Sequence, residues 1–307
     1  MKRLGPYLIF LAAMLWATDA PFRVHLTKDL NSSFIVLVEH FFDVLVVLPI
    51  LLFNLKTLKT FKLKQWLAVL FIAVGGSALA SIAFTQSFSF VNPSVAILLQ
   101  KLQPLIAIGL ASTLLGERAG KNFWIFAGLA MAGAYLISFP GLKPEIFPGE
   151  QFNPNLWGVG LALVAAVLWG ASTVLGRYML SKVDFKVMTT LRFTLAFVFL
   201  LLLNLYNKTI PELSSVSGKD WFYLFIIAVT SGVVSLFIYY KGLAFTKASI
   251  ATLAELGFPM AAVLVNWIFI PGSALVKVQI LGMAILLLAV FNLSRENNNT
   301  PDELKLP

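Results

Sequence analysis

The chain has 307 residues, of which 59% are hydrophobic and only 12% are Asp, Glu, Lys or Arg. Soluble domains carry about 25% charged residues, so this composition excludes a water-soluble globular protein and indicates a membrane protein. The absence of Cys excludes disulfides, thiolate zinc sites and iron–sulfur clusters, and we expect no cofactor. The net charge of +9 is compatible with nucleic-acid binding. However, the basic residues lie in short segments beside apolar runs, which favours membrane orientation over a nucleic-acid partner.

Ten apolar segments are long enough to cross a bilayer, because a helix needs about 20 residues for a hydrocarbon core about 30 Å thick. In chain order, we expect these helices near residues 6–26, 32–53, 65–88, 92–114, 122–140, 155–180, 186–206, 220–241, 247–270 and 275–293. The first segment carries Asp19 and Arg23, is too long for the apolar core of a signal peptide and has no small-residue cleavage site after it. We therefore expect it to remain in the mature protein.

The distribution of Lys and Arg predicts the orientation. If the N-terminus is inside, thirteen of the 23 basic residues fall on the cytoplasmic side and five on the other side. The four lysines between Asn54 and Lys64 account for much of this difference, and binding of anionic lipid is a weaker alternative for them. The positive-inside rule then predicts cytoplasmic termini and a multi-pass protein of the cell (inner, cytoplasmic) membrane.

The two halves of the sequence resemble each other. AAMLWAT at Ala12–Thr18 aligns with AAVLWGA at Ala165–Ala171 at an offset of 153. At an offset of 155, six further residues have matching partners: Phe84, Phe90, Ser94, Ala96, Leu98 and Pro104 align with Tyr239, Phe245, Ser249, Ala251, Leu253 and Pro259. Chance similarity between apolar helices is the alternative. Since five predicted spans, an odd number, separate the copies, the second half enters the membrane from the opposite face, as in inverted-repeat transporters.

This repeat predicts the domain organisation of an all-α membrane protein with ten transmembrane helices. A first five-helix repeat spans residues 1–140, and an inverted second repeat spans 155–293. An extracytoplasmic linker, 141–154, joins them, and residues 294–307 form a polar cytoplasmic tail. Inverted repeats allow each half to adopt the conformation of the other, so that a central site opens to either side of the membrane.

Several motifs carry a family resemblance. They are the tryptophan segments that contain Trp16 and Trp169, QKLQP at Gln100–Pro104, LGER at Leu115–Arg118 and YYKGL at Tyr239–Leu243. With these motifs the chain resembles the drug/metabolite transporter superfamily, and within it the EamA-like permeases. The resemblance implies ten helices in two inverted halves and a transport function. Two features depart from the symmetry: IPGS at Ile270–Ser273 replaces LGER in the second half, and Leu191–Arg192 stand where the first half has Glu39–His40.

Ionisable side chains inside the predicted spans are candidates for the transport site, because each costs about 2.5–3.5 kcal/mol at the bilayer centre and so tends to face protein or water. They are Asp19, Arg23, Glu39, His40, Asp43, Lys101, Arg192, Lys241 and Glu255. The fifth and tenth spans add none to this set and are expected at the periphery. Depth along the helices suggests two alternately closing gates around a midplane site. The outer gate would hold Asp19, Arg23 and Glu39; Asp43 and Lys101 would lie between the gates, and Arg192, Lys241 and Glu255 on the cytoplasmic side.

Helical spacing places Asp19 beside Arg23, and Glu39 beside Asp43. Two carboxylates on one face repel each other unless a cation or a bound proton lies between them. The Asp19–Arg23 pair has a purely structural alternative, and Arg192 and Lys241 have snorkelling as theirs. Lys101 has no carboxylate one turn away on its own helix, so Lys101 and Glu255 are the strongest candidates.

Neutral polar and aromatic residues complete the candidate site. Its polar members are His40, a proton relay or a hydrogen-bonded neighbour, and the amides Gln86, Gln100 and Gln103, which suit a polar solute or bonds between helices. Trp16, Phe84, Trp169, Tyr239 and Tyr240 are predicted to line the cavity and to stack on a ring or a cation.

These observations favour a secondary transporter that moves a small polar or zwitterionic metabolite, such as an amino acid, by alternating access. The sequence has no P-loop, so protons or a counter-substrate would drive the transport. An intramembrane enzyme is the first alternative, but the sequence contains no HExxH motif and only two histidines. A sensor or scaffold without flux is the second. The expected partners are a small-molecule substrate and the lipid bilayer, and the expected oligomeric state is a monomer or a homodimer.

Overall fold

The computed structural model of the chain describes residues 2–87, 90–91, 96, 99–142, 156–211, 213–269 and 275–299. All regular secondary structure in these ranges is helical. Ser94 and Leu98 of the predicted repeat, residues 143–154 of the predicted linker and the last eight residues of the predicted tail lie outside the described ranges.

Seven helices are long and apolar enough to cross a membrane: Ser32–Phe53, Leu63–Ser87, Leu156–Leu180, Phe185–Asn207, Gly218–Leu243, Ala248–Val265 and Lys277–Asn297. The chain is therefore a multi-pass membrane protein. The other three predicted spans also contain helix. The first is interrupted between Trp16 and Ala20, the fourth contains a helix of 12 residues, and the fifth a helix of 18 residues with Lys121 and Asn122 at its start.

The helices of the first half are α1 (Gly5–Trp16), η1 (Ala17–Asp19), α2 (Ala20–Leu26), α3 (Ser32–Phe53), α4 (Leu55–Leu58), α5 (Leu63–Leu70), η2 (Phe71–Leu79), α6 (Ala80–Ser87), α8 (Gln103–Leu114) and α9 (Lys121–Ser138). Those of the second half are α10 (Leu156–Leu180), α11 (Phe185–Asn207), η3 (Leu213–Ser215), α12 (Gly218–Ile227), η4 (Ala228–Val234), α13 (Ser235–Leu243), α14 (Ala248–Ala254), α15 (Gly257–Phe269) and α16 (Lys277–Asn299).

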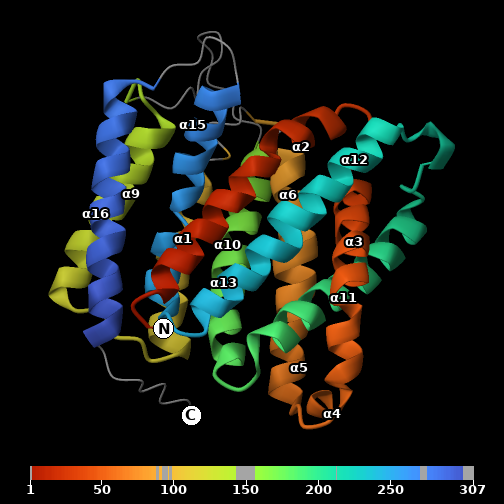
Figure 1. Cartoon of the computed structure of the whole chain (residues 1–307), viewed down its shortest axis with the longest axis horizontal. Coiled ribbons are helices and arrows are strands. Elements are labelled where there is room, and N and C mark those ends of the chain that lie inside the picture. Colours follow the sequence, from red (N-terminus) through yellow and green to blue (C-terminus); the bar gives the residue numbers. More distant parts are fainter. Residues whose placement is uncertain are drawn as a thin grey trace.

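The start of α1 and the end of α16 lie close together at one edge of the bundle. α1 begins and α16 ends at the lower edge in Figure 1, and α10 runs through the bundle in the direction opposite to α1. The hydroxyl of Ser294 donates to the Arg3 carbonyl over 2.6 Å, and the amide of Asn297 donates to the Lys2 carbonyl over 2.9 Å. α16 thus continues into the predicted polar tail, because these buried side chains fasten its last turns to the start of the chain.

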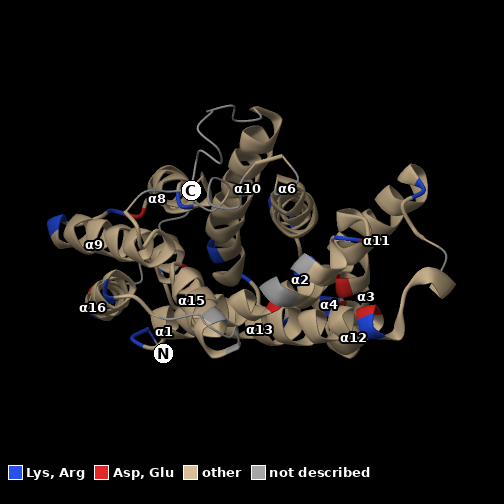
Figure 2. Cartoon of the chain, turned by 90° about the horizontal axis from the view of Figure 1, so that it is seen from above, with Lys and Arg blue, Asp and Glu red and all other residues tan. Residues whose placement is uncertain are grey.

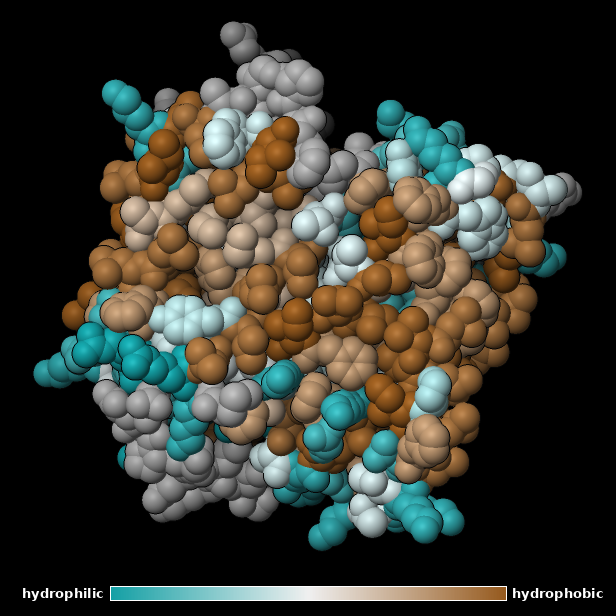
Figure 3. Space-filling view, in the orientation of Figure 1, coloured by the Kyte–Doolittle hydropathy of each residue, from teal (hydrophilic) through white to brown (hydrophobic). Residues whose placement is uncertain are grey.

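The exterior of the molecule is broadly apolar. Figure 3 shows hydrophobic residues across most of one face, and hydrophilic residues mainly toward its edges. Phe53, Leu156 and Tyr206 are each at least 80% exposed. A soluble monomer rarely exposes so much contiguous apolar surface, so lipid is the natural surrounding of this face.

Two long helices contain wide, π-type turns at matching places in the two halves. η2 interrupts the helix from Leu63 to Ser87, and η4 interrupts the helix from Gly218 to Leu243. Such turns are rare and frequently occur at functional sites. Gly75 and Gly76 lie in η2, and Gly232 lies in η4. Small residues at these positions let neighbouring helices approach the backbone.

A turn interrupts helical residues at one further place in each half. A turn at Lys101 and Leu102 precedes α8, and a turn at Glu255 and Leu256 separates α14 from α15. The two breaks correspond to each other in the repeat alignment. Discontinuous helices in transporters place backbone and side-chain polar groups at the membrane midplane, where solutes bind. The fold therefore directs attention to these two breaks.

α9 and α16 pack side by side at one end of the molecule (Figure 2). A Cβ added at Gly133 would lie 2.8 Å from the Gly282 carbonyl oxygen, and a Cβ at Gly282 would lie 2.8 Å from the Gly133 carbonyl oxygen. The two backbones are thus in direct contact, as small residues permit in membrane helix pairs.

We expect Gly133→Ala to destabilise the protein by about 1–3 kcal/mol, because the added methyl group would push the two backbones apart. Gly128→Ala is the matched control on the same helix, since no heavy atom lies within 4 Å of a Cβ there. Thermal unfolding in detergent measures both. Equal melting temperatures for the two variants would contradict the contact.

Glu117 of the LGER motif caps a helix of the other half. Its Oε1 accepts from the Ala248 amide over 2.8 Å, and its Oε2 accepts from the Ser249 amide over 3.0 Å and from the Ser249 hydroxyl over 2.6 Å. A carboxylate at this place satisfies backbone donors at the start of α14 and complements the helix dipole. The LGER motif, which the second half lacks, thus caps the start of α14 through Glu117.

Glu117→Ala should lower the stability by about 1–3 kcal/mol, since it leaves partly buried amide donors without their charged acceptor. Arg118→Ala, which changes an exposed neighbour, controls for altered loop charge and should unfold like the parent. Thermal melts compare the two. A parent-like melt of Glu117→Ala would show that the cap adds little.

Candidate functional site

The Glu255 carboxylate is the centre of a hydrogen-bonded cluster at the α14–α15 break. Its Oε2 accepts from Gln103 Nε2 over 2.7 Å, and its Oε1 accepts from the Tyr239 hydroxyl over 2.7 Å and the Thr173 hydroxyl over 3.2 Å. These donors come from α8, α13 and α10. We call Glu255, Gln103, Thr173 and Tyr239 the Glu255 cluster. Four helices from both halves therefore meet at one carboxylate.

The two repeat tryptophans pack across the halves. The ring of Trp16 from the first half lies 5.2 Å from that of Tyr239 in the second, and Trp169 from the second half lies 5.1 Å from Phe84 in the first. Tyr239 and Phe84 are themselves equivalent in the alignment. The indole N–H of Trp169 also donates to the Gly76 carbonyl in η2 over 3.0 Å. The same aromatic pair thus occurs twice, with the halves exchanged.

Arg192 points into the bundle. Its Nε donates to the Ser77 hydroxyl in η2 over 2.5 Å, and its NH1 donates to the Tyr240 hydroxyl on α13 over 3.0 Å. The guanidinium also lies within electrostatic range of Asp43 and Glu255. These contacts fix the side chain between η2 and α13, an arrangement different from snorkelling to the membrane surface.

Asp43 faces the wide turn of the other half. Its side chain is 1% exposed, and its Oδ1 atom has no hydrogen-bond partner among the described residues. A Cβ at Gly232 would overlap the Asp43 carboxylate, so the glycine makes room for the acid. His40, one turn earlier, bonds through Nδ1 to the Val36 carbonyl over 2.9 Å and packs edge-on against Phe193.

Asp19, Arg23 and Glu39 form the Arg23 cluster. Arg23 NH2 lies 2.9 Å from Asp19 Oδ2, and NH1 lies 3.0 Å from Glu39 Oε1. One guanidinium thus bridges two carboxylates from η1 and α3, and it provides the cation that Glu39 requires. Nearby, His25 Nε2 of α2 lies 3.2 Å from Asp220 Oδ1 of α12, which adds a link between the halves.

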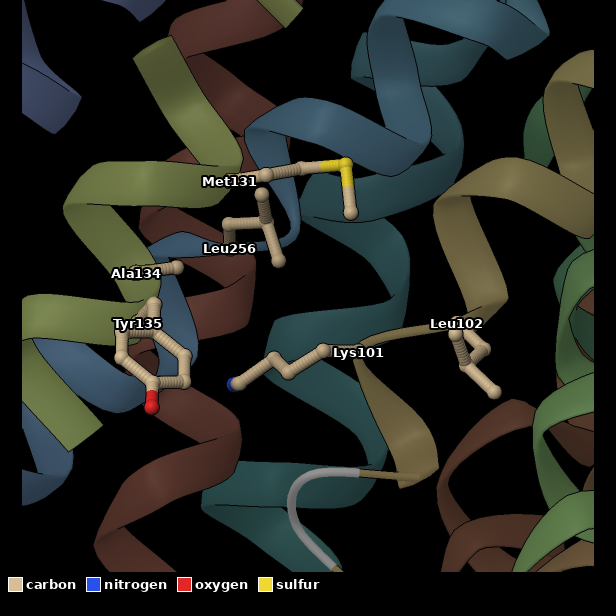
Figure 4. A pocket seen from close by; sticks show the side chains of 6 residues that line it. All are labelled: Lys101, Leu102, Met131, Ala134, Tyr135 and Leu256. Atoms are coloured by element: carbon tan, nitrogen blue, oxygen red, sulfur yellow. The ribbon is translucent and has the colours of Figure 1, made fainter. Parts of the chain in front are cut away.

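Lys101 and Glu255 do not face each other. Lys101 extends toward Tyr135 on α9 and lines a cavity with Leu102, Met131, Ala134 and Leu256 (Figure 4). The three residues that donate to Glu255, which are Gln103, Thr173 and Tyr239, do not line this cavity. Leu256, which follows Glu255 at the break, does line it. Lys101 therefore belongs to a different environment from the Glu255 cluster.

Three polar candidates lie elsewhere. The side chains of Lys241 and Gln86 are exposed, which separates them from the buried groups that the sequence placed beside them. Both follow helical spacing that fits either a cavity or an outer face, and packing of the neighbouring helices decides between the two. The Oε1 atom of Gln100 is buried and has no hydrogen-bond partner among the described residues.

Sequence reasoning missed several contributors. Thr173 lies one helical turn after Trp169, and this spacing on the same face was a usable signal. Ser77 and Asp220 offered none, since serine is common in membrane helices and Asp220 lies in a predicted span end. In the described ranges, no group of three His, Asp or Glu residues is arranged to hold a metal ion.

We expect Arg23→Gln to destabilise the protein by about 1–3 kcal/mol, because Asp19 and Glu39 would then repel each other. This is less than the cost of breaking a fully buried pair, about 3–5 kcal/mol, since the Arg23 side chain is 21% exposed. Thermal unfolding tests the change.

A companion variant removes all three charges, with Arg23→Gln, Asp19→Asn and Glu39→Gln combined. It should recover most of the lost stability if charge balance is the cause. Equal losses in the single and triple variants would instead indicate packing.

Comparison with known proteins gives three findings. The sequence matches the model of the EamA-like transporter family over residues 3–139 and again over 156–295. It is 28% identical over 300 residues to the riboflavin transporter ImpX of Fusobacterium nucleatum subsp. nucleatum, covering 95% of this chain and 98% of that protein. A crystal structure of another protein shares the fold with a TM-score of 0.75 at 16% identity, covering 95% of this chain and 98% of that one.

Proposed function

Since the chain belongs to the EamA-like transporter family, we propose that it is a secondary transporter that moves a small polar organic solute through a site at Glu255. The observation that carries this proposal is the convergence of donors from α8, α10 and α13 on one carboxylate at a helix break. A carboxylate there can exchange a protein donor for a hydroxyl, amide or ammonium group of the solute.

The proposed topology has ten crossings, in two inverted halves, with both termini in the cytoplasm of a cell whose inner membrane holds the protein. Three observations support it: the opposite directions of α1 and α10, the exchanged aromatic pairs, and the matching wide turns η2 and η4. Such halves exchange conformations and open one central site to either side in turn.

We assign the two closures of this cycle to separate polar groups. The Arg23 cluster, together with His25–Asp220, holds α2 to α3 and α12 on the outer side. At the opposite end, Glu117 holds the start of α14, and Asn297 bonds to the carbonyls of Lys2 and Phe245. Lys241 is left out of the second closure, because its side chain is exposed.

The solute class that we favour is a planar polar ring system, with riboflavin as the first compound to test. The relative that matches nearly the full length is a riboflavin transporter, and Trp16 packs on Tyr239 directly beside Glu255. Aromatic side chains of this kind stack on planar rings. An amino acid is the competing class, because acidic and basic groups within the bundle suit a zwitterion.

Counterflow in liposomes tests this proposal. Vesicles with the purified protein are loaded with unlabelled riboflavin, tryptophan or alanine, and entry of the same labelled compound is followed. Glu255→Gln should slow the initial rate at least tenfold, since hydrogen bonds to a charged group contribute about 1.5–3 kcal/mol. The exposed Asp29 provides the control, and Asp29→Asn should transport like the parent.

Each outcome has a distinct meaning. Parent-like transport by Glu255→Gln would refute the assignment of the site. Counterflow of alanine without riboflavin would replace the ring class with the amino-acid class, and no counterflow of any compound would favour a sensor or scaffold. Accumulation driven by an imposed proton gradient would indicate proton coupling, and its absence would indicate exchange.

A further inference from the structure

The cavity beside Lys101 is lined by residues that suit a ligand other than the solute proposed for Glu255. Its volume is about 160 Å³, and its lining is Leu102, Met131, Ala134, Tyr135 and Leu256 together with Lys101. The four aliphatic and thioether side chains make most of this lining apolar. Among the described residues, Lys101 is the one lining residue with a positive charge, and no acidic side chain lines the cavity.

Lys101 lacks a counter-ion within the described part of the chain. The ion pairs Arg23–Asp19, Arg23–Glu39 and His25–Asp220 do not include it. Glu255, the nearest acid in the aligned break, directs its oxygens to Gln103, Thr173 and Tyr239, none of which lines the cavity. An unpaired ammonium at this depth is costly, so a bound anion would relieve that cost.

The backbone next to the cavity also favours a negatively charged ligand. Leu102 immediately precedes α8, a helix of 12 residues, and Leu256 immediately precedes α15, a helix of 13 residues. Both helices therefore begin at the cavity, and the amino end of a helix carries a partial positive charge. Two helix starts and one ammonium group thus favour negative charge at the same place.

From this geometry we propose that the Lys101 cavity binds a small organic monocarboxylate, with its carboxylate at Lys101 and its apolar body between Met131 and Leu256. A benzene-sized body fits, since an engineered apolar cavity of about 150 Å³ in another protein holds benzene. One ammonium matches one carboxylate. A phosphate dianion would call for the bidentate donors of arginine, and no arginine from the described ranges lines the cavity.

Fluorine NMR on the full chain in lipid nanodiscs tests this site directly, without any transport step. The probe is 4-fluorobenzoate, and its neutral counterpart is 4-fluorobenzyl alcohol. The parent should bind the acid more tightly than the alcohol. Lys101→Met should weaken binding of the acid at least tenfold and leave the alcohol unchanged, whereas Lys101→Arg should stay within about threefold of the parent, because only the charge is essential.

Two further measurements guard against misinterpretation. Lys59→Met, which removes an exposed lysine, should bind both probes like the parent. In thermal melts, 4-fluorobenzoate should stabilise the parent, and Lys101→Met should be at least as stable as the parent without the probe. That result would show that the variant folds and that its loss of binding is local.

Competition distinguishes the source of the carboxylate. Displacement of the probe by soluble benzoate indicates a solute from water, and displacement only by oleate in the nanodisc indicates a fatty acid from the bilayer; both support a carboxylate site. Equal binding of acid and alcohol by the parent, or parent-like binding of the acid by Lys101→Met, would overturn the proposal. Because binding is measured without flux, this result is independent of whether Glu255 acts in transport.

Discussion

The bilayer core contains no water, so every backbone polar group there needs a partner from the protein, and this constraint shapes the centre of the molecule. An interrupted helix frees backbone groups and is tolerated only where other chain segments cover it. In this protein polar side chains lie at the interruptions: Asp43 faces Gly232 in η4, Arg192 donates to Ser77 in η2, and Glu255 accepts hydrogen bonds at its break. The polar interior is thus a consequence of where the helices are irregular.

The halves are interlocked by residues that the repeat makes equivalent. Each tryptophan packs on the aromatic residue of the opposite half, and the two ring separations, 5.2 and 5.1 Å, are nearly the same. The symmetry is incomplete. The helix of the first half breaks at η1, whereas its counterpart α10 is continuous, and the charged Arg23 cluster occurs where the first half departs from the second.

The sequence predicted the class of protein and the ionisable residues inside its spans. It predicted less well which residues these contact. Length and hydropathy predicted a multi-pass helical protein, and the family match confirms the resemblance based on the tryptophan, QKLQP, LGER and YYKGL motifs. Spacing correctly paired Asp19 with Arg23, because both lie within one turn of the same chain segment. It could not reveal Thr173 as a donor to Glu255, or the exposure of Lys241, since those depend on how separate helices pack.

Two bonds described separately act on the same pair of helices. Gln103 at the start of α8 holds Glu255 at the end of α14, and Glu117 just past the end of α8 holds Ser249 at the start of α14. Small side chains, Ala107, Ala111 and Ala248, fill the space between. α8 and α14 are therefore antiparallel, and hydrogen bonds join them at both ends. Because one helix comes from each half, a movement of the halves relative to each other at these positions requires one of the two bonds to break.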